Sequence, residues 1–205
     1  MSVPLVDWAA LLGCARTALA EPAAPEIARF LAAWPTACRT RAVAPSALAV
    51  LHWLEAAVEH APPGPLAALA QAVGAAAGAL AWRQSYRPGE VAPAFLDRYG
   101  WCELLGRTGP IPCEELSGGL LLLGPRTHYP PHSHAAEELY VPLSGVAAWQ
   151  RGSADFAWRS PGDYIRHASG EMHSMRTADA PLLALYLWRG AGLGETARLG
   201  TGALL

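Results

Sequence analysis

The pattern of apolar and polar positions changes character near residue 86. Before that point, apolar residues recur at spacings of three and four, which is typical of helices that bury one face. Leu48, Leu51 and Leu54 form one such set, on a helix that Ser46 could cap, and Asp7 could cap the first helix. We expect helices over about residues 7–19, 25–34, 46–61 and 65–84.

From residue 87 onward, the chain consists of short apolar runs separated by Gly and Pro, which is typical of many short strands. This number and spacing of strands suits a double-stranded β-helix, a jelly-roll barrel that closes its own edges. The predicted fold class is mainly β with an α-helical N-terminal part (α+β), in which residues 1–86 cover a barrel of residues 87–205. The Gly-rich tail from Gly190 is expected to be loose. We expect strands over residues 101–105, 119–123, 139–142, 146–151, 154–159, 164–167, 173–177 and 182–188.

The composition allows a large core and excludes some classes of partner. Hydrophobic residues make up 52% of the chain and charged residues 16%, which is enough to bury a substantial core. A net charge of −2 without a basic run argues against nucleic acid as a partner, and no apolar stretch reaches the length of a membrane span. The start lacks a signal-peptide pattern, and the four cysteines form no CxxC pair. We therefore expect reduced thiols and a cytoplasmic protein.

Residues with metal-binding chemistry concentrate in one segment of the second half. His132, His134, Glu138 and Tyr140 all have even numbers, and a strand sends residues of one parity to one face. His173 follows about one hairpin later, after a glycine turn. Three imidazole nitrogens and one carboxylate oxygen make a site for one divalent metal ion. Fe(II), Mn(II), Ni(II), Co(II) and Zn(II) all fit this set of ligands.

The spacing of these residues resembles the two-part metal motif of the cupin superfamily. The first part reads H-x-H-x3-E-x6-G over residues 132–145, and the second contains Pro-Gly-Asp at 161–163 and His173. Arg126 stands where the first part usually has its opening glycine, and Ala168 stands where the second part usually has proline. Neither difference removes a ligand, because both positions belong to turns.

The string YPPHSHAAEELY at 129–140, behind a helical N-terminal segment, is similar to the cupin-type dimethylsulfoniopropionate (DMSP) lyases. In length and layout the chain looks like their short bacterial type, known as DddQ. The resemblance implies that Tyr140, just after the metal-binding glutamate, is the catalytic base. It also implies that Tyr129 contacts the substrate.

Two further aromatic residues are candidates for substrate binding. Tyr186 and Trp188 share a face of the last predicted strand, where their rings could hold a sulfonium or ammonium group by cation–π attraction. Packing in the core is the alternative for both rings. Glu137 has an odd number, opposite to the metal ligands, and is expected to be solvated or to contact the metal ligands without binding the ion itself.

The reaction that the resemblance implies is β-elimination of DMSP to dimethyl sulfide and acrylate. The alternative is a DMSP-lyase-like cupin enzyme that acts on another small carboxylate, as an isomerase, an epimerase or an Fe(II) dioxygenase. A small-molecule sensor would normally add a basic DNA-binding helix pair, which the N-terminal helices do not suggest, and a storage role is disfavoured by the intact ligand set. The expected partner is a small-molecule substrate, and a homodimer is left open.

Overall fold

The computed structural model describes residues 6–20 and 25–200, and it begins with helices. The Asp7 cap is confirmed, because Oδ1 of Asp7 accepts a 2.9 Å hydrogen bond from the Ala10 amide. Among the described residues, no helix has both the length and the apolar character needed to cross a bilayer. The helical elements are α1 (Trp8–Ala20), α2 (Pro25–Ala32), η1 (Ala49–Trp53), α3 (Leu54–Glu59), α4 (Pro65–Ala76), η2 (Ala77–Ala79) and α5 (Pro93–Leu96).

Two expectations about the helices are wrong, for one shared reason. Ser46 caps no helix: its Oγ donates 2.7 Å to the Trp82 carbonyl, and its backbone pairs with Ala81. The last long helix ends at Ala76 rather than near residue 84, because the chain beyond it is extended and Arg83 pairs with Trp101. Long-range backbone pairing thus overrides local helical preference in both segments.

The eight expected strands are all present, with ends shifted by up to three residues. The expected strand ranges do not cover β2, β4 or β11, and no helix was expected at α5. Because β11 pairs with β4, part of the tail that was expected to be loose is held to the barrel. The strands are β1 (Tyr99–Gly106), β2 (Ile111–Pro112), β3 (Leu116–Leu123), β4 (His128–Ser133), β5 (Glu137–Ser144), β6 (Ala147–Arg151), β7 (Ala157–Arg159), β8 (Ile165–His167), β9 (His173–Thr177), β10 (Leu182–Arg189) and β11 (Arg198–Leu199).

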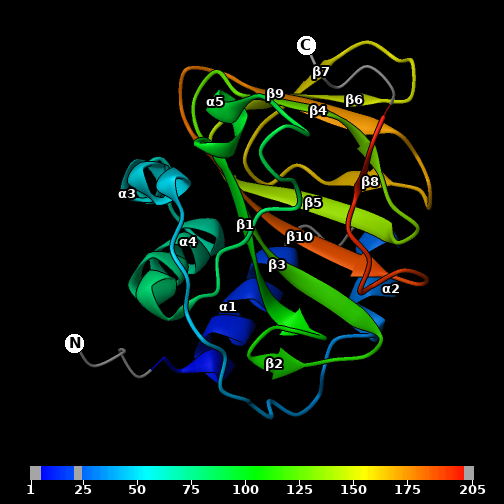
Figure 1. Ribbon diagram of the computed structural model, residues 1–205. Coiled ribbons are helices and arrows are strands. Elements are labelled where there is room, and N and C mark those ends of the chain that lie inside the picture. The colour runs from blue at the N-terminus through cyan, green and yellow to red at the C-terminus, as the bar shows by residue number, and fades with distance from the viewer. Residues whose placement is uncertain (1–5, 21–24, 201–205) are drawn as a thin grey trace.

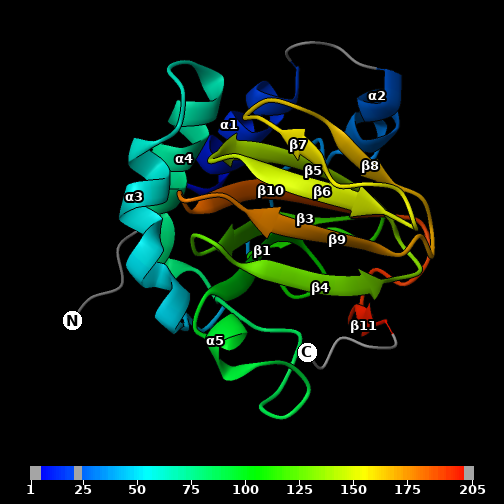
Figure 2. The ribbon, with the colours of Figure 1, turned by 90° about the horizontal axis from the view of Figure 1, so that it is seen from above.

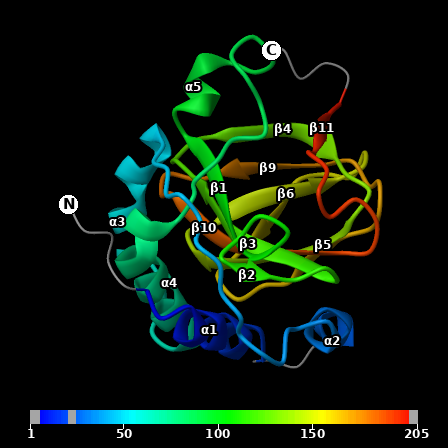
Figure 3. The same cartoon turned by 60° about the horizontal axis from the view of Figure 1, so that its bottom comes forward.

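The strands form two sheets that face each other (Figure 2). One has the order β2-β1-β3-β10-β5-β8 and the other β11-β4-β9-β6-β7, and every pair except β1–β2 is antiparallel. Helices α1, α3 and α4 lie outside the ring of strands (Figures 1 and 3), where α4 contacts β5 and α3 contacts β10. The predicted α+β fold with a two-sheet barrel is confirmed, and the domain boundary at residue 86 stays a prediction.

Alternation along the strands gives the six-stranded sheet two apolar faces. On β3, Leu120 and Leu122 pack toward the helices, whereas Leu121 and Leu123 pack into the barrel. Each such leucine is at most 2% exposed, and burying a leucine completely contributes roughly 1.5–3 kcal/mol. The barrel interior differs from the outer face because it is rich in aromatic rings, and this interior holds the site.

The turn before the metal motif keeps its geometry without the usual glycine. Arg126 has φ +50, a left-handed conformation that costs a non-glycine residue roughly 1–2 kcal/mol. Its amide donates 2.8 Å to the Ala178 carbonyl, and its guanidinium lies 3.5 Å from Asp179. The backbone hydrogen bond ties this turn to Ala178, and β4 begins two residues later at His128, so strand β4 forms without the usual glycine.

Candidate metal centre

Three side chains from three segments converge inside the barrel. His134 directly follows β4, Glu138 lies on β5 and His173 begins β9. Their potential ligand atoms all lie within 4.8 Å of one another. All three residues are buried, with exposures of 6%, 0% and 2% respectively. This group could hold a metal ion, as the sequence predicted for its members.

The hydrogen bonds of the two histidines orient them for this role. Nδ1 of His134 lies 2.9 Å from the Ala136 carbonyl, and Nδ1 of His173 lies 2.8 Å from the Glu171 carbonyl. A carbonyl can only accept, so each Nδ1 carries the proton and each Nε2 is left with a lone pair. Backbone carbonyls that fix the histidine tautomer in this way are typical of metal sites.

The contacts of Glu138 show why the group suits a cation. Its Oε2 lies 3.0 Å from Nε2 of His134 and 3.1 Å from Nε2 of His173. Lone pairs on carboxylate and imidazole repel unless a proton or a metal ion lies between them. In the protein alone a proton takes this place: burial by itself would raise the pKa of Glu138, but hydrogen bonds and positive charge from the protonated forms of His134 and His173 hold that pKa well below its usual range. The donor set therefore fits a divalent ion.

His132, the remaining predicted ligand, lies beside this group. It is the direct β4–β9 partner of His173, and the two rings are 4.2 Å apart. Its Nδ1 is 2.9 Å from the Pro130 carbonyl, so Nε2 is again left unprotonated. Burial and the charge of His173 hold the pKa of His132 well below its usual range. Its role as a ligand stays a prediction.

Tyr140 follows Glu138 on the same face of β5 and lines the same cavity. It pairs directly with Tyr186 across the β5–β10 ladder, and its ring lies 4.9 Å from that of Trp149. In the protein alone, burial and then the Glu138 charge raise the pKa of Tyr140 well above its usual value. Tyr140 and Glu138 share a face of the strand, as the sequence predicted. The surrounding residues by themselves do not lower the pKa of Tyr140, as a catalytic base would require.

The other predicted binding residues also line the cavity. Tyr129 stacks on His132 with ring centroids 4.0 Å apart, and its hydroxyl lies 3.2 Å from the hydroxyls of Tyr86 and Tyr99. Trp188 stacks on the ring of His134 at 4.0 Å and directs its indole N–H at Glu138. Trp188 therefore supports the metal ligands as well as facing the cavity, which its position in the sequence did not indicate.

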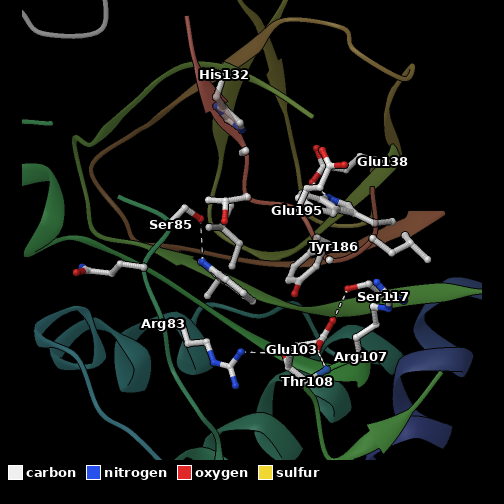
Figure 4. Close-up of a pocket in the computed structure, with 18 of the residues that line it drawn as sticks. Arg83, Ser85, Glu103, Arg107, Thr108, Ser117, His132, Glu138, Tyr186 and Glu195 are labelled. Atoms are coloured by element: carbon white, nitrogen blue, oxygen red, sulfur yellow. Dashed lines mark hydrogen bonds between the residues drawn. The ribbon is translucent and has the colours of Figure 1, made fainter. Parts of the chain in front are cut away.

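The cavity has a volume of about 270 Å³ and extends away from the metal ligands (Figure 4). Besides aromatic rings it exposes Glu103, Ser117 and Thr108, which the sequence analysis missed. The lining also includes Arg107, Leu121, residues 83–85 and residues 193–197, and none of the described helices contributes to it. The space suits a small ligand with both charged and apolar parts.

Residues 24–184 match the family model of the dimethylsulfoniopropionate lyases. This protein belongs to the DMSP lyase family. Over 116 residues the chain is 38% identical to dimethylsulfoniopropionate lyase DddQ of Ruegeria pomeroyi, covering 56% of this chain and 58% of that protein. Over 130 residues it is 37% identical to the putative dimethylsulfoniopropionate lyase DddL of Cereibacter sphaeroides, covering 62% and 53%. The matches thus span a little over half of these curated relatives.

Solved structures from the DMSP lyase family resemble the whole fold. The crystal structure of DMSP lyase DddQ from Ruegeria pomeroyi superposes with a TM-score of 0.84 at 30% identity, covering 94% of this chain and 95% of that one. A structure from a study of the DMSP lyases RdDddP and RnDddQII gives a TM-score of 0.83 at 35% identity, covering 95% and 97%. The DddQ-like resemblance stated from the sequence is therefore confirmed.

Proposed function

We propose that this protein is a metal-dependent lyase that cleaves DMSP to dimethyl sulfide and acrylate by β-elimination. One observation carries the proposal. In a member of the DMSP lyase family, the buried group His134, Glu138 and His173 borders an aromatic cavity, which Glu138 and Tyr140 both line. This arrangement supplies a site for a substrate carboxylate and a candidate base beside it.

His134, Glu138 and His173 would hold the divalent ion, with His132 as the proposed fourth ligand. When bound, the ion supplies positive charge against the substrate carboxylate, which lowers the cost of forming an enolate. Burial and Glu138 both raise the pKa of Tyr140, so Tyr140 can act as a base near neutral pH only with additional positive charge at the site.

Tyr140 removes a proton from the carbon next to the substrate carboxylate. The electron pair of that C–H bond becomes the new carbon–carbon double bond, and the electrons of the C–S bond leave with sulfur. Dimethyl sulfide departs as a neutral molecule, so its departure needs no acid. Tyr140 then returns the proton to solvent.

Tyr129, Tyr186 and Trp188 are the proposed substrate contacts. All three line the cavity, and Tyr186 lies directly across from Tyr140 in the sheet. Their rings exclude water from the reacting carbon and can contact the methyl groups of a sulfonium.

Headspace assay of dimethyl sulfide tests the proposal, using purified, metal-reconstituted protein incubated with DMSP under nitrogen. We expect production of dimethyl sulfide by the native protein and none by Tyr140→Phe, with the metal content of the variant near normal. Tyr164→Phe is a matched control, because Tyr164 donates to the Leu19 carbonyl on α1, away from the cavity. Loss of metal from Tyr140→Phe would make Tyr140 a ligand, and unchanged turnover would remove it from the mechanism.

A protein that binds metal but releases no dimethyl sulfide would contradict the proposed reaction. The alternative is then an isomerase, an epimerase or an Fe(II) dioxygenase acting on another small carboxylate. Oxygen consumption by the Fe(II)-loaded protein separates the oxygenase from the other two.

A further inference from the structure

A second buried carboxylate projects into the cavity at a distance from the metal ligands. Glu103 on β1 is 8% exposed and lines the cavity. Its Oε2 accepts hydrogen bonds from the amide and hydroxyl of Thr108, and its Oε1 accepts one from Ser117. Among the described residues, no arginine or histidine lies within ion-pair distance of it. A buried carboxylate is costly without a positive partner, so the absence of one in this part of the chain points to a cationic ligand.

The sheet register fixes where Glu103 lies relative to Tyr140. Glu103 pairs with Gly119, Gly119 pairs with Tyr186, and Tyr186 pairs with Tyr140. Neighbouring strands are about 4.8 Å apart, so the backbones of Glu103 and Tyr140 are about 14 Å apart measured along the curved sheet, and both side chains line the cavity. Figure 4 shows Glu138 at one end, Glu103 at the other and Tyr186 between them.

Gly119 lies between Glu103 and Tyr186 in the sheet and places no side chain between them. A Cβ atom there would lie 1.8 Å from the Cys102 carbonyl oxygen, so no larger residue fits. Without a side chain at this position, Glu103 and Tyr186 face the same space. The ring of Trp101 borders it as well, 6.3 Å from the ring of Tyr186 in an edge-to-face arrangement.

Other charged residues of the cavity have other partners. Arg83 donates 2.8 Å to the Thr108 hydroxyl, which itself donates to Glu103, so its guanidinium reaches that carboxylate only through a neutral hydroxyl. Arg107 is exposed and lies 3.4 Å from Glu114. Glu195 is exposed and lies 4.0 Å from Arg198. Glu103 is therefore the buried charge available to a ligand at the end of the cavity remote from the metal ligands.

We propose that Glu103 is the specificity-determining residue for the cationic end of the substrate, and that the cavity selects small zwitterions with a carboxylate at one end and an onium group at the other. The carboxylate of Glu103 faces the onium charge, while Trp101 and Tyr186 contact its methyl groups. This inference deepens the proposed function, because DMSP is such a zwitterion.

A purely structural role for Glu103 makes different predictions. Its hydrogen bonds to Thr108 hold the turn that follows β1, so any substitution can lower stability. A structural residue would change the affinity equally for ligands with a charged and with an uncharged head group. A residue that recognises the charge would change the ratio of the two affinities.

Calorimetry with an isosteric ligand pair measures that ratio on the metal-loaded protein. The pair is β-alanine betaine, a zwitterion, and its tert-butyl analogue, in which an uncharged tert-butyl group replaces the trimethylammonium group. Both carry the same carboxylate and nearly the same shape. We expect the native protein to bind the betaine about tenfold more tightly than the tert-butyl analogue, and this preference to disappear in Glu103→Gln while the affinity for the tert-butyl analogue changes little.

Glu115→Gln is the matched control, because it removes the same charge from an exposed position. It should leave the ratio unchanged. A preference that persists in Glu103→Gln, or that falls equally in Glu115→Gln, would overturn the inference.

Steady-state kinetics with DMSP provide a second readout. The sulfonium loses its positive charge as the C–S bond breaks, so Glu103 stabilises the bound substrate more than the transition state. We expect Glu103→Gln to raise KM about tenfold without lowering kcat. Lyase activity with an unchanged KM and an unchanged ligand ratio would sink this inference alone. A Glu103-dependent ratio in a protein that makes no dimethyl sulfide would instead sink only the proposed reaction.

Discussion

The indole N–H of Trp188 donates a 2.6 Å hydrogen bond to Oε1 of Glu138. The two residues are direct partners in the β5–β10 ladder, so the sheet itself fixes their contact. With Oε1 held by the indole, Oε2 is the oxygen that faces the histidines of the metal centre. The two oxygens of one carboxylate thus have separate tasks.

Removing this indole N–H should weaken metal binding without removing a ligand. Trp188→Phe retains an aromatic ring against His134 but loses the donor to Glu138. Partners of this kind are typically worth about 10–100-fold in metal affinity, so we expect a loss of that size in a competition titration with a chelator. Trp158→Phe is the control, since Trp158 is 61% exposed. Equal metal affinities for the native protein and Trp188→Phe would rule out a positioning role.

The neighbours Glu137 and Glu138 should respond in opposite ways to the same substitution. Glu137 faces away from the metal centre and forms ion pairs with Arg29, Arg166 and Arg189, at distances of 3.7, 2.5 and 3.2 Å. Glu137→Gln should retain metal and lower the free energy of unfolding by about 1 kcal/mol, as expected for a partly exposed network. Glu138→Gln should lose the metal. Metal analysis and urea denaturation of both variants check this, and metal loss from Glu137→Gln would contradict the assignment of faces.

The sequence could predict which side chains of one strand point toward the site and which point away from it. The shared parity of Glu138 and Tyr140, and the opposite parity of Glu137, follow from the period of a strand alone. The Asp7 cap was equally local, since its partner is Ala10. These features involve residues within a few positions of one another, where chain geometry leaves few choices.

Features set by long-range register could not be predicted. The contact between Trp188 and Glu138 depends on the pairing of β10 with β5, and the position of Glu103 depends on the order β1-β3-β10-β5. Ser46 was expected to cap a helix because its local sequence fits that role, but pairing with Ala81 holds it elsewhere. The alternation of apolar and polar positions within one strand does not indicate which strand becomes its neighbour.

The histidines should differ in how strongly metal content depends on them. His134→Ala should lose metal and activity together, because His134 belongs to the group with converging ligand atoms. His132→Ala should also weaken metal binding, because Nε2 of His132 is unprotonated and its ring adjoins that of His173. Elemental analysis after dialysis measures both, with the exposed His60→Ala as control. Full metal content in His132→Ala would limit the protein ligands to three.

The buried tyrosines should make the protein sensitive to alkaline pH. Burial, followed by the charge of Tyr99, raises the pKa of Tyr86, and burial likewise raises the pKa of Tyr99. In the unfolded chain a tyrosine loses its proton at about pH 10, so above that pH the unfolded state binds fewer protons than the folded state. The free energy of unfolding should therefore be unaffected by these groups below about pH 10 and fall as pH rises above it.

Tyr99→Phe separates this effect from the loss of hydrogen bonds. The variant loses the contacts of the Tyr99 hydroxyl with Ser85 and Tyr129, which lowers stability at every pH. It also loses one group that must ionise on unfolding, so its stability should fall less steeply with pH. Cys102, whose pKa burial raises to about 12, contributes a slope of the same sign in both proteins and cancels in the comparison. Urea denaturation at several pH values between about 8 and 11 measures the slopes. Parallel slopes would show that Tyr99 ionises as readily in the folded protein as in the unfolded chain.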